Sequence, residues 1–291
     1  MTNPSGSALP DFPAERPEDL GMIAVDMDGT FLGPGYPPRY DRARFAPLRR
    51  RMREAGVRFV VASGNQEAQL LAYFDGWEDG VELAPDGVIS DAGAIVLADG
   101  QRLLETSMSQ EALRAAVEVL ADQPGIGLVA SGPRGALVPD NQDETMRGLL
   151  AFYHPNSSPV PTIRDVLGHG VSKLALVDLA GFDPGVSVRL QAVLGEEVVA
   201  VTSGHESIDL IVAGRHKAFG LDVLLEHWGL GAGQVAAFGD SQNDAEMLAH
   251  VGYGIAVANA SQAAKDSARY LAPDNAIGGV MTVLESWFPG P

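Results

Sequence analysis

The stretch Met22-Ile23-Ala24-Val25-Asp26-Met27-Asp28-Gly29-Thr30 joins an apolar run to two carboxylates that lie two residues apart. The apolar run predicts a buried strand, and residues i and i+2 of an extended chain point to the same face. A carboxylate pair at the end of a buried strand costs free energy unless a cation neutralises it or chemistry uses it. We therefore expect a functional site where this strand ends.

A turn and a calcium loop can also contain Asp and Gly at such spacing. Asp and Gly are common turn formers, so the segment also fits an ordinary turn. An EF-hand calcium loop does not fit, because that loop follows a helix and needs glycine at its sixth position. Here Gly29 is the fourth residue counted from Asp26, and a predicted strand precedes it.

Apolar strands alternate with helical patterns in the first third of the chain and again over 218–291. This alternation predicts an α/β fold with a parallel sheet, because parallel neighbours need a crossover helix between them. The expected strands are 22–25, 58–62, 87–90, 235–238, 255–257 and 270–271, and the expected helices are 41–55, 66–74, 218–228 and 244–250.

The middle of the chain has a different pattern and predicts a second, smaller α+β unit inserted into the first. Its expected helices are 109–122, 142–153 and 183–194, and its expected strands are 126–130, 135–138, 171–178 and 197–202. We expect a core of residues 20–96 and 205–291 and an insertion of residues 97–204. Residues 1–19 contain four prolines and several acids, which predicts a disordered leader.

The composition limits the partners. The chain has 291 residues, with 20 Lys and Arg against 38 Asp and Glu, a formal net charge of −18. Nucleic acids and anionic membranes select basic surfaces, so we expect neither as a partner. The run Arg49-Arg50-Arg51 is expected to be a solvated helix face. There are no cysteines, which excludes thiol nucleophiles and zinc–thiolate sites. No apolar run approaches the roughly 18 residues of a membrane span, so we expect a cytoplasmic protein.

A carboxylate pair at a strand end suits aspartyl-phosphate chemistry. A carboxylate is a weak nucleophile, but it suffices for a phosphoryl group that Mg²⁺ polarises. Asp26 would attack phosphorus, and Asp28 would protonate the leaving alkoxide and later deprotonate water. Gly29 and Thr30 would offer backbone N–H groups to the phosphate oxygens.

Three further segments supply groups that such a site needs. Ser63, Gly64 and Asn65 follow a predicted strand and open a helix, where a hydroxyl and backbone amides can hold phosphate. Lys217 opens another helix and would supply a cation. The segment Gly239-Asp240-Ser241-Gln242-Asn243-Asp244 follows an apolar strand, and Asp240 suits a hard cation. Asn243 can contact phosphate, and Asp244 can orient Lys217 or bound water.

Each of these segments also has an ordinary structural interpretation. Ser63 fits an N-cap, Lys217 fits a solvated surface lysine, and Asn243 with Asp244 fits a helix cap. Asp240 is the strongest signal of the three segments, because capping does not require an acid at that position.

In this order, the motifs resemble the haloacid dehalogenase superfamily of phosphatases, and the likeness covers roughly residues 20–288. The branch that they match is the Cof type, which has a Rossmann-like core with a parallel sheet and a large inserted α+β cap of the C2 type. Two segments are similar to the sugar phosphatases of that branch: Val60-Val61-Ala62-Ser63-Gly64-Asn65-Gln66, and Ile208-Asp209-Leu210-Ile211 before His216-Lys217-Ala218.

The resemblance implies a Mg²⁺-dependent phosphomonoester hydrolase. Asp26 would be nucleophile and metal ligand, Asp28 would be general acid/base and bind metal through its backbone carbonyl, and Asp240 would be the other protein ligand. The residues expected to bind phosphate or substrate are Gly29, Thr30, Ser63, Gly64, Asn65, Lys217 and Asn243, with Asp244 behind them.

The sequence departs from the Cof pattern at three positions. Asn65 stands where most members have arginine, so an arginine contact to substrate is absent. Ala92 stands where many have asparagine, and Asp209 stands where many have glutamate. The changes at Asn65 and Asp209 fit the sugar-phosphatase subgroup, whereas Ala92 has no explanation in the sequence.

The leading hypothesis is therefore hydrolysis of a small sugar phosphate, with the cap closing over the substrate. The alternatives are a phosphatase for a nucleotide, flavin or pyridoxal phosphate or a phosphoglycerate ester, and a non-catalytic sugar-phosphate-binding protein. A binder would not need two carboxylates facing an anionic ligand. The candidates for sugar contact are Asn141, His169, Ser172, Lys173, His205 and Glu206.

Overall fold

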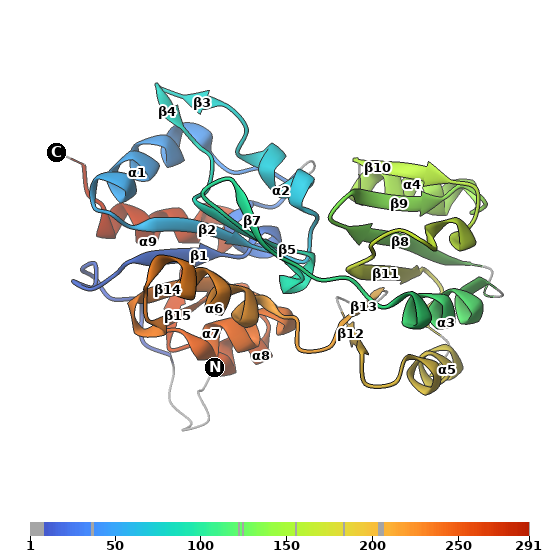
Figure 1. Ribbon diagram of the computed structural model, residues 1–291. Coiled ribbons are helices and arrows are strands. Elements are labelled where there is room, and N and C mark those ends of the chain that lie inside the picture. Colours follow the sequence, from blue (N-terminus) through green and yellow to red (C-terminus); the bar gives the residue numbers. More distant parts are fainter. Residues whose placement is uncertain are drawn as a thin grey trace.

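The computed structural model describes residues 9–290 apart from residues 36, 37, 122, 124, 155, 183 and 203–206. It contains an eight-stranded sheet and a six-stranded sheet, which lie side by side with their helices (Figure 1). The eight-stranded sheet has the order β16-β15-β14-β1-β2-β5-β6-β7. Its six strands from β16 to β5 run parallel, and β6 and β7 continue the sheet in antiparallel fashion.

The strands of the larger sheet are β1 (Met22–Val25), β2 (Arg58–Ala62), β5 (Gly87–Ser90), β6 (Ile95–Ala98), β7 (Gln101–Glu105), β14 (Val235–Gly239), β15 (Tyr253–Val257) and β16 (Tyr270–Ala272). Its helices are α1 (Arg42–Glu54), α2 (Glu67–Tyr73), α6 (Lys217–Trp228), α7 (Ala245–His250), α8 (Gln262–Ser267) and α9 (Gly279–Trp287). A small hairpin, β3 (Trp77–Glu78) and β4 (Val81–Glu82), follows α2. Helices α1 and α9 pack together, as do α6, α7 and α8 (Figure 1).

The smaller sheet has the order β10-β9-β8-β11-β13-β12. Its strands are β8 (Ile126–Gly132), β9 (Gly135–Pro139), β10 (Ser157–Val160), β11 (Lys173–Asp178), β12 (Val198–Thr202) and β13 (Ser207–Val212), and its helices are α3 (Gln110–Ala121), α4 (Glu144–Tyr153) and α5 (Pro184–Leu194). One apolar cluster joins this sheet to α3 and α5, and another joins it to α4.

The register of the larger sheet places the expected site residues at one edge. Val25 of β1 pairs with Phe238 of β14 on one side and with Val61 of β2 on the other. The residues that follow these strands therefore emerge next to one another at the carboxyl edge of the parallel sheet, which is where open α/β sheets bind ligands. Every residue of β1 is buried, so the residues at this edge follow a well-packed strand.

The chain passes from the larger sheet to the smaller one, and back again, later in the sequence than we expected. We placed the insertion at 97–204, but β6 and β7 pair within the larger sheet and β13 pairs within the smaller one. Residues 97–105 therefore belong to the larger sheet, because they form a hairpin that extends it beyond β5. We propose a core of 20–105 and 213–290 and call residues 106–212 the cap.

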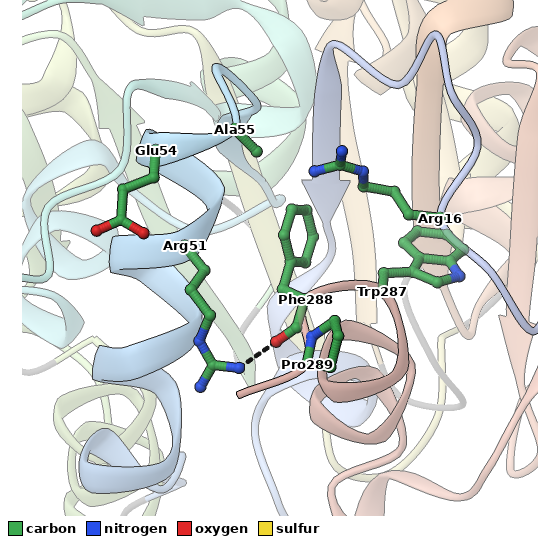
Figure 2. Close-up of a pocket in the computed structure, with 7 residues that line it drawn as sticks. All are labelled: Arg16, Arg51, Glu54, Ala55, Trp287, Phe288 and Pro289. Carbon is green, nitrogen blue, oxygen red and sulfur yellow. Dashed lines mark hydrogen bonds between the residues drawn. The ribbon is translucent and has the colours of Figure 1, made fainter. Parts of the chain in front are cut away.

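The leader differs from the expected disorder over residues 9–19, and residues 1–8 lie outside the described part of the chain. The backbone of Phe12 donates to Leu271 of the edge strand β16 at 3.1 Å. The Trp287 indole donates to the Pro13 carbonyl at 2.7 Å. Arg16 lies over the ring of Phe288, while Arg51 of α1 donates to the Phe288 carbonyl (Figure 2). The segment thus ties β16 to α9.

The arginine run also corrects an expectation. Arg50 is exposed, but the side chain of Arg49 is fully buried against the ring of Phe59. Its guanidinium pairs with Asp86 at 2.8 Å and donates to the Ala84 carbonyl at 2.9 Å. Arg49 is therefore a structural residue of the core. Among the described residues, no helix is both long enough and apolar enough to cross a membrane.

The buried position of Arg49 predicts a stability difference within the run. Arg49→Met leaves the Asp86 carboxylate without its cation, so we expect the free energy of unfolding to fall by about 3 kcal/mol. Arg50→Met removes an exposed side chain, and we expect a change within about 0.5 kcal/mol. Urea unfolding of both variants checks this, and equal losses would contradict the role given to Arg49.

Candidate active site

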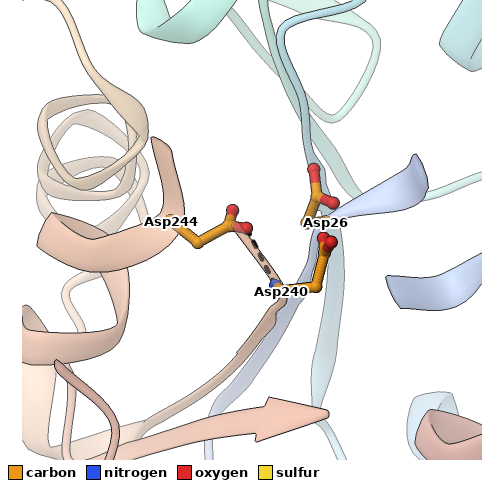
Figure 3. A group of neighbouring side chains, drawn as sticks. All are labelled: Asp26, Asp240 and Asp244. Carbon is orange, nitrogen blue, oxygen red and sulfur yellow. Dashed lines mark hydrogen bonds between the residues drawn. The ribbon is translucent and has the colours of Figure 1, made fainter. Parts of the chain in front are cut away.

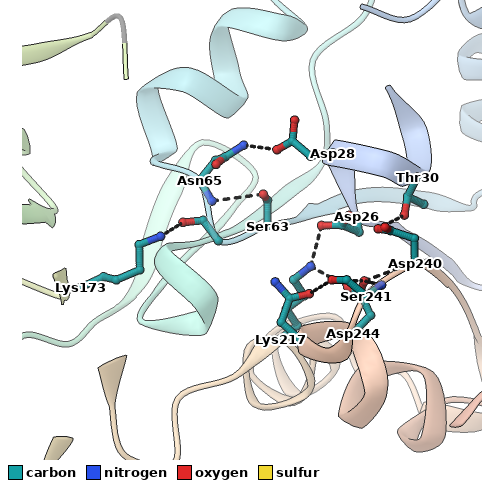
Figure 4. Close-up of polar contacts among 12 residues, drawn as sticks. Asp26, Asp28, Thr30, Ser63, Asn65, Lys173, Lys217, Asp240, Ser241 and Asp244 are labelled. Carbon is teal, nitrogen blue, oxygen red and sulfur yellow. Dashed lines mark hydrogen bonds and ion pairs between the residues drawn. The ribbon is translucent and has the colours of Figure 1, made fainter. Parts of the chain in front are cut away.

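The deepest part of the site is an ion pair between the end of β1 and the start of α6. Asp26 is 5% exposed and Lys217 is 2% exposed. The Lys217 ammonium donates to Oδ1 of Asp26 at 2.6 Å (Figure 4). The ring of His216 accepts from the backbone N–H of Phe219 at 3.2 Å and so caps α6. Because the first turn of the helix is fixed, the direction of the Lys217 side chain is fixed with it.

Asp244 connects this pair to the loop that follows β14. Its Oδ1 accepts from Lys217 at 2.6 Å, and its Oδ2 accepts from the backbone N–H groups of Asp240 and Ser241, each at 3.0 Å. Thr30 donates its hydroxyl to Oδ1 of Asp240 at 2.9 Å. Both oxygens of Asp244 are therefore engaged with protein groups, and the loop carries Asp240 toward Asp26.

Three carboxylates are thus gathered around one ammonium. Oxygen atoms of Asp26, Asp240 and Asp244 lie within 4.8 Å of one another (Figure 3). Burial raises the pKa of Asp26 and of Asp240, and the charge of Lys217 opposes both rises. Burial lowers the pKa of Lys217, but the carboxylates of Asp244 and Asp26 raise it by more. The two carboxylates thus favour the charged form of Lys217 in this cluster.

The donor set fits Mg²⁺. With its three carboxylates ionised and one ammonium, the cluster carries an uncompensated negative charge, and its free donors are hard oxygen atoms of the kind that Mg²⁺ prefers. Gly29 contributes by having no side chain: at its φ of +79°, an added Cβ would lie 2.6 Å from Oδ2 of Asp240. A larger residue at position 29 would fill the space beside that carboxylate.

Asp28 faces a different group of residues. Its carboxylate is exposed, and its Oδ2 accepts from the side-chain amide of Asn65 at 2.6 Å. The hydroxyl of Ser63, itself 3% exposed, accepts from the backbone N–H of Asn65 at 3.1 Å. The structure therefore engages the amide of Asn65 with Asp28, whereas we expected it to contact phosphate or substrate.

The remaining expected residues lie around these two groups. Asn243 accepts from the hydroxyl of Ser241 at 2.6 Å. The Gly64 carbonyl accepts from Lys173 of the cap at 2.8 Å. Gly29 and Thr30 lie in the tight turn Met27–Phe31 that carries Asp28, so this turn joins the Asp26 cluster to the Asp28 group.

Ala92 has an unusual backbone conformation. It has a φ of +56°, in the left-handed region where asparagine is among the better tolerated side chains. Its N–H donates to the Ser63 carbonyl at 3.2 Å. Asparagine would therefore suit this conformation better than alanine, and nothing in the structure explains the alanine at this position.

Sequence reasoning missed Asn259, which holds the turn after β1 from the side of β15. Its amide donates to the Gly29 carbonyl at 2.8 Å, and its Oδ1 accepts from the backbone N–H of Asn275 at 3.0 Å. The signal was available, because Asn259 closely follows an expected strand at the same sheet edge.

The residues expected to contact the sugar lie in different surroundings. Ser172 is fully buried and donates to the Thr106 carbonyl at 2.7 Å, so its hydroxyl is engaged within the protein. Lys173 reaches the core, as described above. Asn141 lines a hollow of the cap between α3 and α4. His169 is bonded through its carbonyl to Gln110. His205 and Glu206 lie outside the described residues.

Residues 23–284 match the haloacid dehalogenase-like hydrolase family. The 5-amino-6-(5-phospho-D-ribitylamino)uracil phosphatase YbjI of Escherichia coli K12 is 35% identical over 266 residues, which cover 91% of this chain and 95% of the relative. A phosphoglycolate phosphatase of Pyrobaculum neutrophilum is 31% identical over 252 residues, covering 85% and 87%. The crystal structure of SMU.1108c from Streptococcus mutans superposes with a TM-score of 0.78 at 28% identity, covering 91% and 98%.

The charge of the cluster predicts a response to Mg²⁺ that needs no substrate. We expect Mg²⁺ to raise the melting temperature by about 5 °C when its concentration is about 100 times Kd. Asp240→Asn should melt higher than the wild type in EDTA, because one repelling charge is gone, and it should lose most of the gain from Mg²⁺. Asp266→Asn, an exposed carboxylate on α8, is the control. Equal gains from Mg²⁺ in both variants would contradict a metal site at Asp240.

Proposed function

We propose that this chain, which belongs to the haloacid dehalogenase-like hydrolase family, hydrolyses a small phosphomonoester through a phosphorylated Asp26. The observation that carries this proposal is the buried Asp26 carboxylate, held at 2.6 Å by Lys217 in a cluster with Asp240 and Asp244. A buried carboxylate with an adjacent fixed cation is suited to approach a phosphate that the same cation attracts.

In the first step, a carboxylate oxygen of Asp26 attacks phosphorus and the bond from phosphorus to the leaving-group oxygen breaks. Protonated Asp28 gives its proton to the departing alkoxide, which leaves as an alcohol. In the second step, Asp28 accepts a proton from water as the water oxygen attacks the phosphoryl group on Asp26. Inorganic phosphate leaves, and both aspartates return to their starting states.

The remaining residues hold the phosphate. Lys217 would neutralise one phosphate oxygen while it holds Asp26, and Ser63, Gly64 and Asn243 would donate to the others. We propose Asp26, the backbone carbonyl of Asp28, and Asp240 as the residues that hold Mg²⁺. When bound, Mg²⁺ supplies positive charge that offsets the repulsion between the carboxylates and the phosphate dianion.

We further propose that the leaving group is a polyol, as in a sugar phosphate. The cap and core meet where Lys173 pairs with Asp209 and donates to Gly64, and where Ser131 donates to Asp91. The two carboxylates outnumber the one ammonium, so this contact carries a net negative charge when both are ionised. A second anionic group on the substrate would be repelled there, whereas hydroxyl groups would not. This disfavours esters such as phosphoglycolate, the substrate named for the Pyrobaculum relative.

One specific candidate of this class is the ribitylaminouracil phosphate for which the Escherichia coli relative is named. The Escherichia coli relative is named for a uracil that carries a phosphorylated ribityl chain, which is itself a polyol phosphate. Its 35% identity covers nearly the whole of both chains, which favours this ester as a candidate beside hexose and pentose phosphates.

Asp26→Asn tests the nucleophile. An amide cannot form the acyl phosphate, so we expect phosphate release to fall below detection with every substrate. The measurement is phosphate release from sugar phosphates, the ribitylaminouracil phosphate, nucleotides, flavin mononucleotide, pyridoxal phosphate, phosphoglycerate and phosphoglycolate, with Mg²⁺ or EDTA. Asp266→Asn should retain the wild-type rate. Turnover at the wild-type rate by Asp26→Asn would overturn the mechanism, and wild type that binds but never hydrolyses would favour a binding protein.

Lys217→Met tests the buried cation. We expect kcat/KM to fall, because the phosphate loses a fixed positive charge. The loss should correspond to about 2–4 kcal/mol of transition-state stabilisation. The matched control is Lys265→Met, since Lys265 is also buried and donates to the Ala258 carbonyl at 2.7 Å away from Asp26. Similar kinetic losses in both variants would show that removal of any buried lysine has this effect.

A further inference from the structure

Two side chains of the cap bond to the core: one to the loop 63–65 itself, and one to Asp91 of the turn that is bonded to this loop. Lys173 of β11 donates its ammonium to the Gly64 carbonyl at 2.8 Å (Figure 4). Ser131 of β8 donates its hydroxyl to Oδ1 of Asp91 at 2.8 Å. Lys173 and Ser131 are partners in the register of β8 and β11, so they lie on one face and near the core end of the cap sheet.

The lysine is held in place within the cap. It is 6% exposed, and Oδ2 of Asp209 on β13 lies 3.2 Å from its ammonium. A buried lysine is costly unless its charge is paired and its donors are bonded. Asp209 supplies the charge and Gly64 supplies a hydrogen-bond acceptor, so the contact with the core satisfies a group that would otherwise be buried without sufficient partners.

The serine acts on the same loop through a strained turn. Asp91 and Ala92 have φ values of +46° and +56°, which non-glycine residues rarely adopt. The N–H of Asp91 donates to the Asn65 carbonyl at 3.1 Å, and the N–H of Ala92 donates to the Ser63 carbonyl. Asp91 is 1% exposed, so Ser131 provides a hydrogen bond to a carboxylate that water cannot reach.

From this loop, one side chain reaches the proposed acid/base. The amide of Asn65 donates to Oδ2 of Asp28 at 2.6 Å, and Asp28 is otherwise exposed. An exposed carboxylate samples several rotamers unless a neighbour selects one. Whatever fixes residues 63–65 therefore fixes the direction of the Asp28 carboxylate.

We infer that Lys173 and Ser131 are positioning residues, which hold the loop 63–65 when the cap is closed so that Asn65 orients Asp28 toward the leaving group. The inference rests on the proposed function, since it concerns the proton that Asp28 would donate. It makes the position of the cap a condition for proton transfer and not only for the exclusion of water.

The test compares two esters that differ in their need for a proton. A sugar alkoxide leaves poorly unless it is protonated, whereas p-nitrophenolate leaves without that help. Single-turnover rates, with enzyme in excess over a pentose phosphate or p-nitrophenyl phosphate, isolate the first step for each ester. General acid catalysis contributes about 10²–10⁴-fold, so loss of its orientation should lower the sugar-phosphate rate at least about tenfold.

We expect Lys173→Met, Ser131→Ala and Asn65→Ala to lower the sugar-phosphate rate in this way and to change the p-nitrophenyl phosphate rate less than about threefold. Lys173→Arg keeps a charged donor and should restore part of the ratio. Ser172→Ala is the matched control: it removes a buried hydroxyl next to Lys173 that bonds to Thr106 and not to the loop. It should leave the ratio of the two rates unchanged.

Hydrogen exchange tests the first link without any turnover. Backbone amides over 63–66 should exchange faster in Lys173→Met than in wild type or Ser172→Ala. Equal losses for both esters in the cap variants, or an unchanged ratio in Lys173→Met and Ser131→Ala, would overturn the inference while leaving the proposed function intact. A folded wild type that hydrolyses neither ester would overturn the proposed function, and the inference with it.

Discussion

The buried ion pair between Asp26 and Lys217 is the interaction on which the rest of the structure depends. It joins residues that are 191 positions apart, and the whole cap lies between them in the sequence. Neither charge is tolerable alone in this position, because the desolvation of an unpaired buried ion costs several kcal/mol. The end of β1 and the start of α6 must therefore meet.

The pair also determines how the carboxylates of the loop after β14 must be arranged. A single ammonium between Asp26 and Asp244 leaves negative charge in excess, and Asp240 adds to it. Both oxygens of Asp244 accept hydrogen bonds, one from Lys217 and the other from backbone N–H groups of its own loop. Asp244 therefore holds Lys217 and the loop in place. Asp26 and Asp240 remain as the carboxylates that face one another, which is the reason that the cluster suits a hard cation.

The sequence predicted the α/β fold and the strands around the site, because the buried parallel strands are unbroken apolar runs that end in polar residues. The family was predicted from the resemblance of the ordered motifs at these strand ends. It did not place the cap boundary, since the hairpin of β6 and β7 was not recognised, although Asp99-Gly100 is a typical hairpin turn. Arg49 could not be told from its neighbours Arg50 and Arg51 by residue type. Only its helical spacing from Phe45 and Met52 places it on the buried face of α1. The roles given to the site residues remain predictions.

Asn65 stands where the resemblance to the Cof pattern leads us to expect arginine. This difference shows that a motif does not determine the function of each residue in it. An arginine at this position is long enough to reach a substrate, whereas the shorter amide of Asn65 reaches Asp28 instead. The same backbone position can therefore contact a substrate directly or act through Asp28, the proposed acid. Since the loop that carries Asn65 is held by Lys173 and Asp91, the choice between these roles involves the cap as well as the core.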